Sequence, residues 1–158
     1  MKLFCRAIKK EDLSKWEKLA KSEFLEEDFC SEQYLLNKWA CLKGWVVMTS
    51  EKEWIGCCFI DSKLHHYNPK GIHFLEYCVF PKFRGQHYAK YLLKLQFDHA
   101  IGFKKSVCIN PNNTPSISLA TKYGFKPVEL HKTWMIYICE ADYYPPELKN
   151  LELEMLEE

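Results

Sequence analysis

The chain has 158 residues, of which 47% are apolar and 27% are charged, a balance typical of one globular domain with a single core. The formal net charge of +1 argues against a strongly basic nucleic-acid-binding protein, and no apolar run approaches the roughly 20 residues that a membrane helix needs. We therefore expect one cytoplasmic domain with neither nucleic acid nor membrane as a partner.

The eight cysteines do not predict a disulfide framework. The chain begins with an apolar stretch of only a few residues, too short for a secretory signal, and most cysteines lie inside apolar runs, so buried reduced thiols are expected. The charge is uneven, because residues 147–158 carry a net charge of −4 and the rest of the chain therefore carries +5. A mildly basic body suits a small anionic ligand.

The N-terminal half predicts a strand, two helices and a hairpin. Residues 2–8 form a short strand, and Asp12 opens the first helix. Ser31 is placed to cap a second helix, which Gly44 ends. Two apolar runs then flank a polar turn, as in a β-hairpin, and a polar loop follows; these segments are residues 45–49, 54–60 and 61–71.

The C-terminal half predicts a strand, a helix, a strand, a helix and two further strands. Residues 72–80 form an apolar run that Pro81 ends, which is typical of a central strand. The apolar period then changes to that of a helix ending at Gly102, with one buried stripe of Ala89, Leu92, Leu93, Phe97, Ala100 and Ile101. The remaining elements are expected at residues 106–109, 114–123, 125–130 and 133–139.

The order β-α-α-β-β-β-α-β-α-β-β predicts an α/β (α+β) fold with a mixed, mostly antiparallel central sheet and helices on both faces. Residues 1–144 form this domain. Residues 145–158 form an acidic C-terminal helical tail, because Leu148, Leu151 and Met155 keep helical spacing. The tail packs either on the domain or on another subunit, so we expect a monomer or a homodimer.

The junction of the central strand with the next helix carries the clearest chemical signal. Residues 79–89 read VFPKFRGQHYA, a turn that brings backbone N–H groups to the start of a helix. Those first amides have no partner inside the helix, and the helix dipole is positive there, so the turn can bind a pyrophosphate. The alternative is an ordinary turn between a strand and a helix, with an arginine on the surface.

The junction resembles the pyrophosphate loop of the GNAT superfamily of N-acetyltransferases. That loop has Arg or Gln, two residues, Gly, one residue, and Gly or Ala; Arg84 matches the first position and Ala89 the last, whereas His87 replaces the middle glycine. A second match is Asn113, followed by a helix that ends in Gly124-Phe125. In the family this asparagine contacts the pantetheine arm of the cofactor.

The resemblance implies an acetyltransferase domain over residues 1–144, with acetyl-CoA as co-substrate, an amine as acceptor and no metal. Two central strands splay apart and hold the pantetheine arm, and one backbone N–H polarises the thioester carbonyl. The implied arm contacts are Cys78, Val79 and Phe80, and the implied pyrophosphate loop is Arg84, Gly85, Gln86, His87, Tyr88 and Ala89. We expect His87 to keep helical backbone angles, with its ring turned away from the phosphates or donating to them.

The sequence offers more than one candidate for the acid and the base. An amine with a pKa of about 10.4 needs a base before it attacks, and Glu76 is a better candidate than His73, which lies on the opposite face of a regular strand. Many relatives place a proton-donating tyrosine where this chain has Ala120, and Tyr123 is an imperfect substitute. Other relatives carry a glutamate where this chain has Cys108.

Two classes of function therefore stay open: an N-acetyltransferase, and a catalytically impaired GNAT-fold module that binds CoA or a partner. Cys108 has apolar neighbours, so a buried core thiol is a better interpretation than a nucleophile. His65 and His66 lack the spaced ligands of a metal site. The acceptor amine stays unidentified, although a group of acidic residues hints at a cation: Glu23, Glu26, Glu27 and Asp28.

Overall fold

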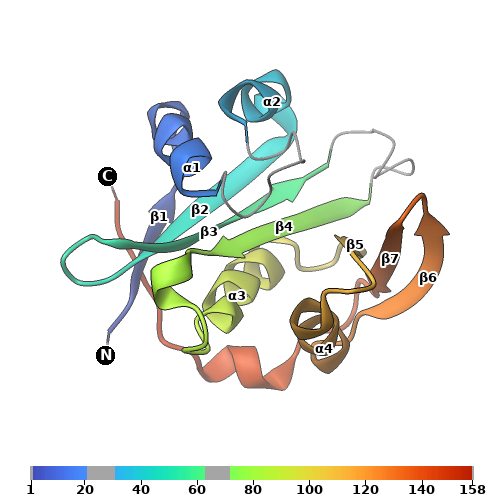
Figure 1. Ribbon diagram of the computed structural model, residues 1–158. Coiled ribbons are helices and arrows are strands. Elements are labelled where there is room, and N and C mark those ends of the chain that lie inside the picture. The colour runs from blue at the N-terminus through green and yellow to red at the C-terminus, as the bar shows by residue number, and fades with distance from the viewer. Residues whose placement is uncertain (1, 21–30, 63–71, 158) are drawn as a thin grey trace.

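A mixed sheet forms the centre of the protein, with its strands in the order β6-β7-β5-β4-β3-β2-β1-β8 (Figure 1). The computed structural model describes residues 2–20, 31–62 and 72–157. Neighbouring strands are antiparallel except for the β4–β5 and β1–β8 pairs, which confirms the predicted mixed, mostly antiparallel sheet. The strands are β1 Phe4–Ala7, β2 Leu42–Met48, β3 Trp54–Asp61, β4 His73–Val79, β5 Lys105–Ile109, β6 Lys126–His131, β7 Trp134–Cys139 and β8 Glu154–Met155.

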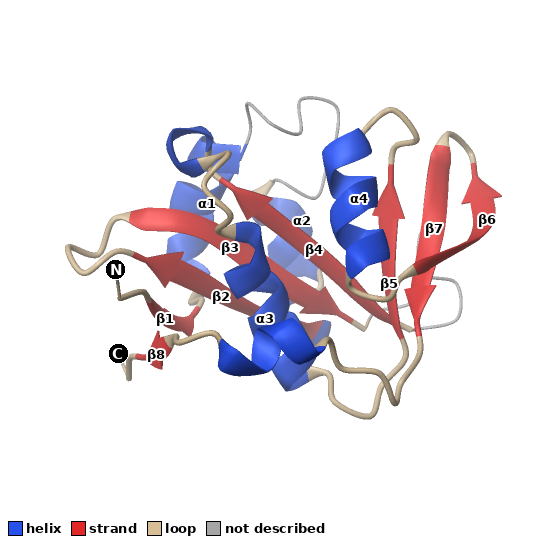
Figure 2. Cartoon of the chain, turned by 90° about the horizontal axis from the view of Figure 1, so that it is seen from below, coloured by secondary structure: helices blue, strands red, loops and turns tan. Residues whose placement is uncertain are grey.

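Helices cover both faces of this sheet, as predicted. Figures 1 and 2 show α1 and α2 on one face and α3 and α4 on the other. Each face has its own apolar core: Trp16 of α1 packs on Phe59 at 5.1 Å between ring centroids, and Phe97 of α3 packs on Phe125 at 5.9 Å. The helices are α1 Leu13–Ala20, α2 Glu32–Asn37, α3 Ala89–His99 and α4 Thr114–Lys122.

The start of each N-terminal helix is fixed by a polar contact. Asp12 accepts hydrogen bonds from Arg6 at 2.7 Å and from the amide of Lys9 at 2.8 Å just before α1 begins. Ser31 caps α2 as predicted, because its hydroxyl oxygen accepts from the Tyr34 amide at 3.0 Å. No helix in the described part of the chain is long and apolar enough to cross a membrane.

The expectation that Gly44 ends the second helix is wrong. α2 ends at Asn37, a short 3-10 helix covers Trp39–Cys41, and Gly44 lies inside β2. A Cβ atom at this position would lie 2.6 Å from Ile8 and 2.6 Å from the Phe59 ring. The glycine therefore allows β2 to approach the core closely. In the sequence alone, a glycine at this position is easily taken for the end of a helix.

Two further expectations need correction. Ile101 is not part of the buried stripe: α3 ends at His99, and the Ile101 side chain beyond it is 68% exposed. The tail is helical only over the 3-10 turn Pro146–Asn150, which buries Leu148 against the core. Met155 instead lies in β8, because the tail extends and pairs with the open edge of β1.

The sheet opens between β4 and β5 (Figure 2). The two strands form a parallel ladder at only two positions, His73 with Lys105 and Phe74 with Ser106. From Leu75 to Val79, β4 keeps its ladder with β3 but has none with β5. The predicted splay of the two central strands is therefore present, and it begins close to the start of β4.

Candidate active site

The two faces of β4 present different groups beside the opening. Glu76 pairs in register with Phe59 and, like Cys78, lies on the face covered by α1 and α2. Tyr77 and Val79 alternate with them and pack against the core on the α3 and α4 side. The opening therefore has a carboxylate toward one layer of helices and a phenol toward the other.

The loop that follows β4 has the backbone geometry of an anion site. A 3-10 turn over Pro81–Phe83 leads to Gly85 at φ +73° and His87 at φ +64°, and α3 begins at Ala89. Within the described residues, the N–H groups from Gly85 to Ala89 have no hydrogen-bond acceptor. Consecutive amides without an acceptor at the N-terminus of an eleven-residue helix form a concave site of positive electrostatic potential, and this site suits phosphate oxygens.

The expectation that His87 keeps helical backbone angles is wrong. Its φ of +64° is left-handed, a conformation that favours glycine and that histidine tolerates better than most other residues. This left-handed turn is where the family pattern has its middle glycine. The histidine thus keeps the backbone path that a glycine would adopt, and its side chain is exposed.

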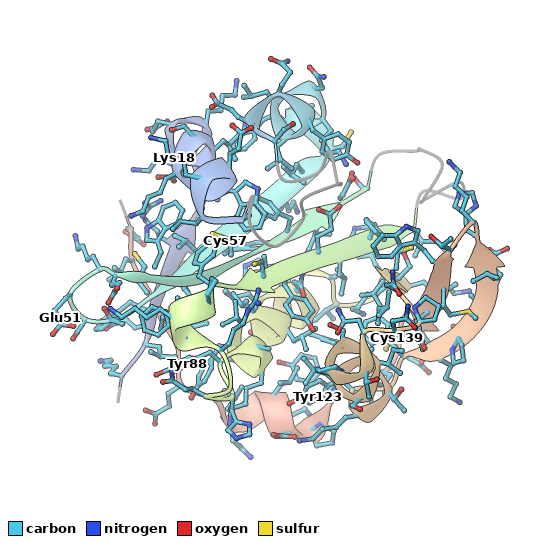
Figure 3. The ribbon with its side chains drawn as sticks, viewed as in Figure 1. Lys18, Glu51, Cys57, Tyr88, Tyr123 and Cys139 are labelled. Atoms are coloured by element: carbon cyan, nitrogen blue, oxygen red, sulfur yellow. The ribbon has the colours of Figure 1, made fainter. Side chains whose placement is uncertain are left out.

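Side chains brace this loop from both ends. The Arg84 Nε donates to the Val79 carbonyl at 3.0 Å, and the Gln86 Nε2 donates to the Lys82 carbonyl at 3.3 Å. The Tyr88 ring, which Figure 3 shows beside the start of α3, packs edge-on against Phe83 with 5.9 Å between centroids. The loop is therefore held in shape by its own residues.

A buried charged group lies on the Glu76 face of the sheet. The Lys38 Nζ donates to the Tyr34 hydroxyl at 2.7 Å and to Asp61 Oδ2 at 2.5 Å, and the Lys38 and Asp61 side chains are only 4% and 0% exposed. Burial lowers the pKa of Lys38, but the fields of Glu76 and Asp61 and the two hydrogen bonds outweigh it, so that pKa is raised. Asp61 was not among the predicted site residues, although an aspartate at the end of an apolar strand indicates a buried polar site.

His73 lies away from this group. It is on the face of β4 opposite Glu76, as predicted, and its ring stacks on Phe103 with 4.2 Å between centroids, at the closed end of the opening. Burial lowers the pKa of His73, and the nearby charges of Lys43 and Lys105 lower it further.

Tyr123 and Tyr77 are arranged differently from what sequence reasoning expected. Tyr123 ends α4 and is 2% exposed; burial raises its pKa, and so do the charge and hydrogen bond of Glu147 in the C-terminal 3-10 turn (Figure 3). Tyr77, which sequence reasoning missed, reaches from β4 to α4 and forms a hydrogen bond with the Ser116 side chain. Burial raises the pKa of Tyr77 to about 12, so it keeps its proton at neutral pH.

The second predicted motif has a clear structural role. Asn113 caps α4, since its side-chain oxygen accepts from the Ser116 amide at 3.3 Å. Gly124 ends the helix at φ +92°, and Phe125 is buried in the core. Ala120 is buried on α4, and Cys108 is partly exposed on β5.

Some predicted features lie outside the described residues, namely Glu23, Glu26, Glu27, Asp28, His65 and His66. Among the residues that are described, no group of three or more His, Cys, Asp or Glu side chains is arranged to hold a metal ion.

A mixed sheet that opens between two central strands, with unpaired amides where the following helix begins, defines the class of fold that binds acyl-CoA in acyltransferases. The model of the acetyltransferase (GNAT) family matches residues 11–125, and the chain belongs to that family. The family uses acetyl-CoA as its acyl donor. No curated protein matches the sequence.

Solved structures show the same fold at low sequence identity. A chimera of spermidine N-acetyltransferase from Vibrio cholerae and hSSAT is 16% identical with a TM-score of 0.68, covering 96% of this chain and 100% of its own. The Vibrio cholerae enzyme in complex with CoA and spermine is 16% identical with a TM-score of 0.65, covering 87% and 93%. PH1933 from Pyrococcus horikoshii is 20% identical with a TM-score of 0.67, covering 86% and 98%.

Proposed function

We propose that this protein transfers an acetyl group from acetyl-CoA to a primary amine of a small molecule, peptide or protein. The observation that carries the proposal is the opening between β4 and β5, at whose wide end the unpaired amides from Gly85 to Ala89 lie. An anion held by these amides at the start of α3 would place the rest of its molecule beside the part of β4 that forms no ladder with β5. Acetyl-CoA has this shape, a pyrophosphate followed by a long, thin pantetheine arm.

In this arrangement the pyrophosphate lies on the amides from Gly85 to Ala89, with the Arg84 guanidinium beside it. The arm follows β4 along Cys78, Val79 and Phe80, with Asn113 on the other side of the opening. The thioester then reaches Glu76 and Tyr77, close to where the two strands come together. A backbone N–H of this part of β4 stabilises the negative charge that develops on the thioester oxygen.

Glu76 accepts the proton of the attacking amine. The structure supports this choice over His73, because Glu76 lies on the open part of β4, whereas His73 is stacked on Phe103 where the strands are paired. Attack of the amine nitrogen on the thioester carbon forms the amide and expels the CoA thiolate. Tyr77 is better placed than Tyr123 to donate a hydrogen bond to that thiolate, because Tyr123 interacts with Glu147 in the tail.

Thermal unfolding with acetyl-CoA, followed by measurement of amine-dependent CoA release, tests the proposal. Mass spectrometry should detect the released CoA, because the exposed thiol of Cys41 would react with a thiol reagent. The acceptor panel consists of polyamines, aminoglycosides, amino acids and peptide N-termini. We expect acetyl-CoA to raise the Tm and at least one amine to be acetylated.

Stabilisation by acetyl-CoA without turnover on any acceptor would favour the alternative, a GNAT-fold module that binds CoA or a partner. The absence of the family's usual tyrosine at Ala120 keeps this alternative in view. The oligomeric state, monomer or homodimer, stays a prediction, and sedimentation of the purified protein would determine it.

A further inference from the structure

The buried group on the Glu76 face, formed by Tyr34, Lys38 and Asp61 and called here the Lys38 cluster, is costly to maintain. Its charged members are almost completely removed from water. A buried ion pair often contributes less to stability than apolar residues of similar volume would, because both ions lose their hydration. The cluster therefore points to a role other than stability.

Strand register places this cluster beside Glu76. Phe59 pairs with Glu76 and Asp61 pairs with Phe74, so Asp61 and Glu76 are diagonal neighbours on the same face of adjacent antiparallel strands. Diagonal neighbours lie roughly 7–8 Å apart, within reach of a long side chain. Two carboxylates at this separation repel each other, and each disfavours ionisation of the other.

Lys38 offsets this repulsion. Its Nζ is held by Tyr34, one helical turn earlier, and by Asp61, so the ammonium has a defined place on the Glu76 side of the sheet. The field of Glu76 is the strongest of the influences that oppose burial and raise the pKa of Lys38. Because an electrostatic interaction is mutual, the Lys38 ammonium stabilises the ionised form of Glu76 by the same interaction.

We propose that Lys38 is a positioning residue for Glu76: held between Tyr34 and Asp61, it keeps the Glu76 carboxylate ionised and therefore ready to accept the proton of the acceptor amine. The inference rests on the proposed function, since it assigns Lys38 to the base of that reaction. Lys38 itself does not touch the reacting atoms, and Asp61 acts through it by fixing its ammonium.

Several other titratable groups lie on the described part of this face. Among the described residues they include the Tyr34 phenol, Asp61, the thiols of Cys57 and Cys78, and the Arg6–Asp12 ion pair, whose charges act on Cys57. Cys108 shares the Glu76 face by strand alternation with Ser106. Burial raises the pKa of Cys57, and burial also raises that of Tyr34. Lys38 is the described cation whose pKa the charge of Glu76 raises, so we assign Lys38 as the counter-charge of Glu76.

The proposal predicts opposite effects for the two halves of the ion pair. In Lys38→Met the cation is lost and Asp61 remains, so Glu76 should titrate at a pH higher by about one unit or more. In Asp61→Asn the competing carboxylate is lost and the cation remains, so Glu76 should titrate at a lower pH. Lys38→Arg keeps the charge and should restore most of the wild-type titration.

The experiment measures these titrations by NMR of protein labelled with ¹³Cδ-glutamate, with the Glu76 signal assigned by its loss in Glu76→Gln. The acid limb of the pH profile of kcat/KM should move in the same directions, because it reports the base in the free enzyme. If Lys38→Met unfolds, the Lys38→Met/Asp61→Asn double variant, which leaves neither member of the buried ion pair charged, replaces it. Glu76 should again titrate at a higher pH, because the Lys38 ammonium favours the ionised form of Glu76.

An unchanged or lowered Glu76 titration in the variant that lacks Lys38, or the same direction of change in Asp61→Asn as in Lys38→Met, would overturn the proposal. The NMR measurement needs no turnover. A wild-type protein that acetylates no amine would therefore count against the proposed function, while the titrations would still decide whether Lys38 controls the charge of Glu76.

Discussion

The left-handed backbone of His87 leads to the sharpest prediction for the pyrophosphate loop. At φ +64° a residue other than glycine costs roughly 1–2 kcal/mol, which His87→Gly removes. The glycine also gives the unfolded chain more freedom, which costs about 0.4–1 kcal/mol. The net effect on the free energy of unfolding should lie between about zero and a gain of 1.5 kcal/mol, or a rise in Tm of up to roughly 5 °C.

Two matched variants separate the backbone of this position from its side chain. His87→Asn keeps a residue that tolerates the left-handed region and should behave like the wild type. His87→Val introduces a β-branched side chain, which strains this conformation, and should cost about 1–3 kcal/mol and weaken CoA binding by disturbing the amides from Gly85 to Ala89. Thermal unfolding and calorimetric titration with CoA measure both properties for each variant.

The reasoning predicts that His87→Gly binds CoA as tightly as the wild type or more tightly, because the amides keep their directions and a side chain is removed. A folded His87→Gly protein that binds CoA tenfold or more weakly would show that the imidazole itself donates to the phosphates. A Tm that falls by several degrees in His87→Gly, or equal Tm values for His87→Val and wild type, would refute the left-handed assignment.

Further variants test the rest of the site. Arg84→Ala should weaken CoA binding by about 1–3 kcal/mol, the scale of a charge-assisted hydrogen bond. Calorimetry should show no such loss in Lys18→Ala, which removes a charge from α1 instead, and equal affinities for Arg84→Ala and wild type would refute the placement of the pyrophosphate. Glu76→Gln should lower kcat/KM by roughly 10²- to 10⁴-fold with CoA affinity unchanged, whereas full activity at neutral pH would move the base to His73 or to water. Burial raises the pKa of Asp12, but the contacts with Arg6 and Lys9 outweigh it and hold that pKa below its usual value, so the stability that Asp12 contributes should be present at neutral pH and lost on acidification through the folded-state pKa. Denaturant unfolding of Asp12→Asn should therefore show a stability deficit at pH 7 that shrinks toward about pH 2, and a deficit independent of pH would contradict this account.

Local patterns in the sequence predicted much of this fold. The apolar run of β4, the helical stripe of α3 and the Ser31 cap are determined by neighbouring residues, so their spacing revealed them. The opposite faces of His73 and Glu76 followed from strand alternation alone. These are the features that do not depend on contacts between distant parts of the chain.

The features that escaped prediction depend on distant contacts or on backbone angles. Lys38 and Asp61 are 23 residues apart and meet only because α2 packs over β3, so neither residue alone revealed the pair. Gly44 resembles a helix stop until the close approach of Phe59 is known. The positive φ of His87 could not be predicted, because a histidine, unlike a glycine, does not indicate a left-handed turn in the sequence.

The central claim is that acetyl-CoA binds in the opening between β4 and β5, with its pyrophosphate on the amides that begin α3. The most direct test is a ¹⁵N-HSQC titration of the protein with CoA. We predict saturable shifts of the backbone amides from Gly85 to Ala89 and of Val79, with much smaller shifts in β6, on the far side of β7. Saturable binding that leaves the amides from Gly85 to Ala89 unshifted, or no binding by the folded protein, would contradict the account.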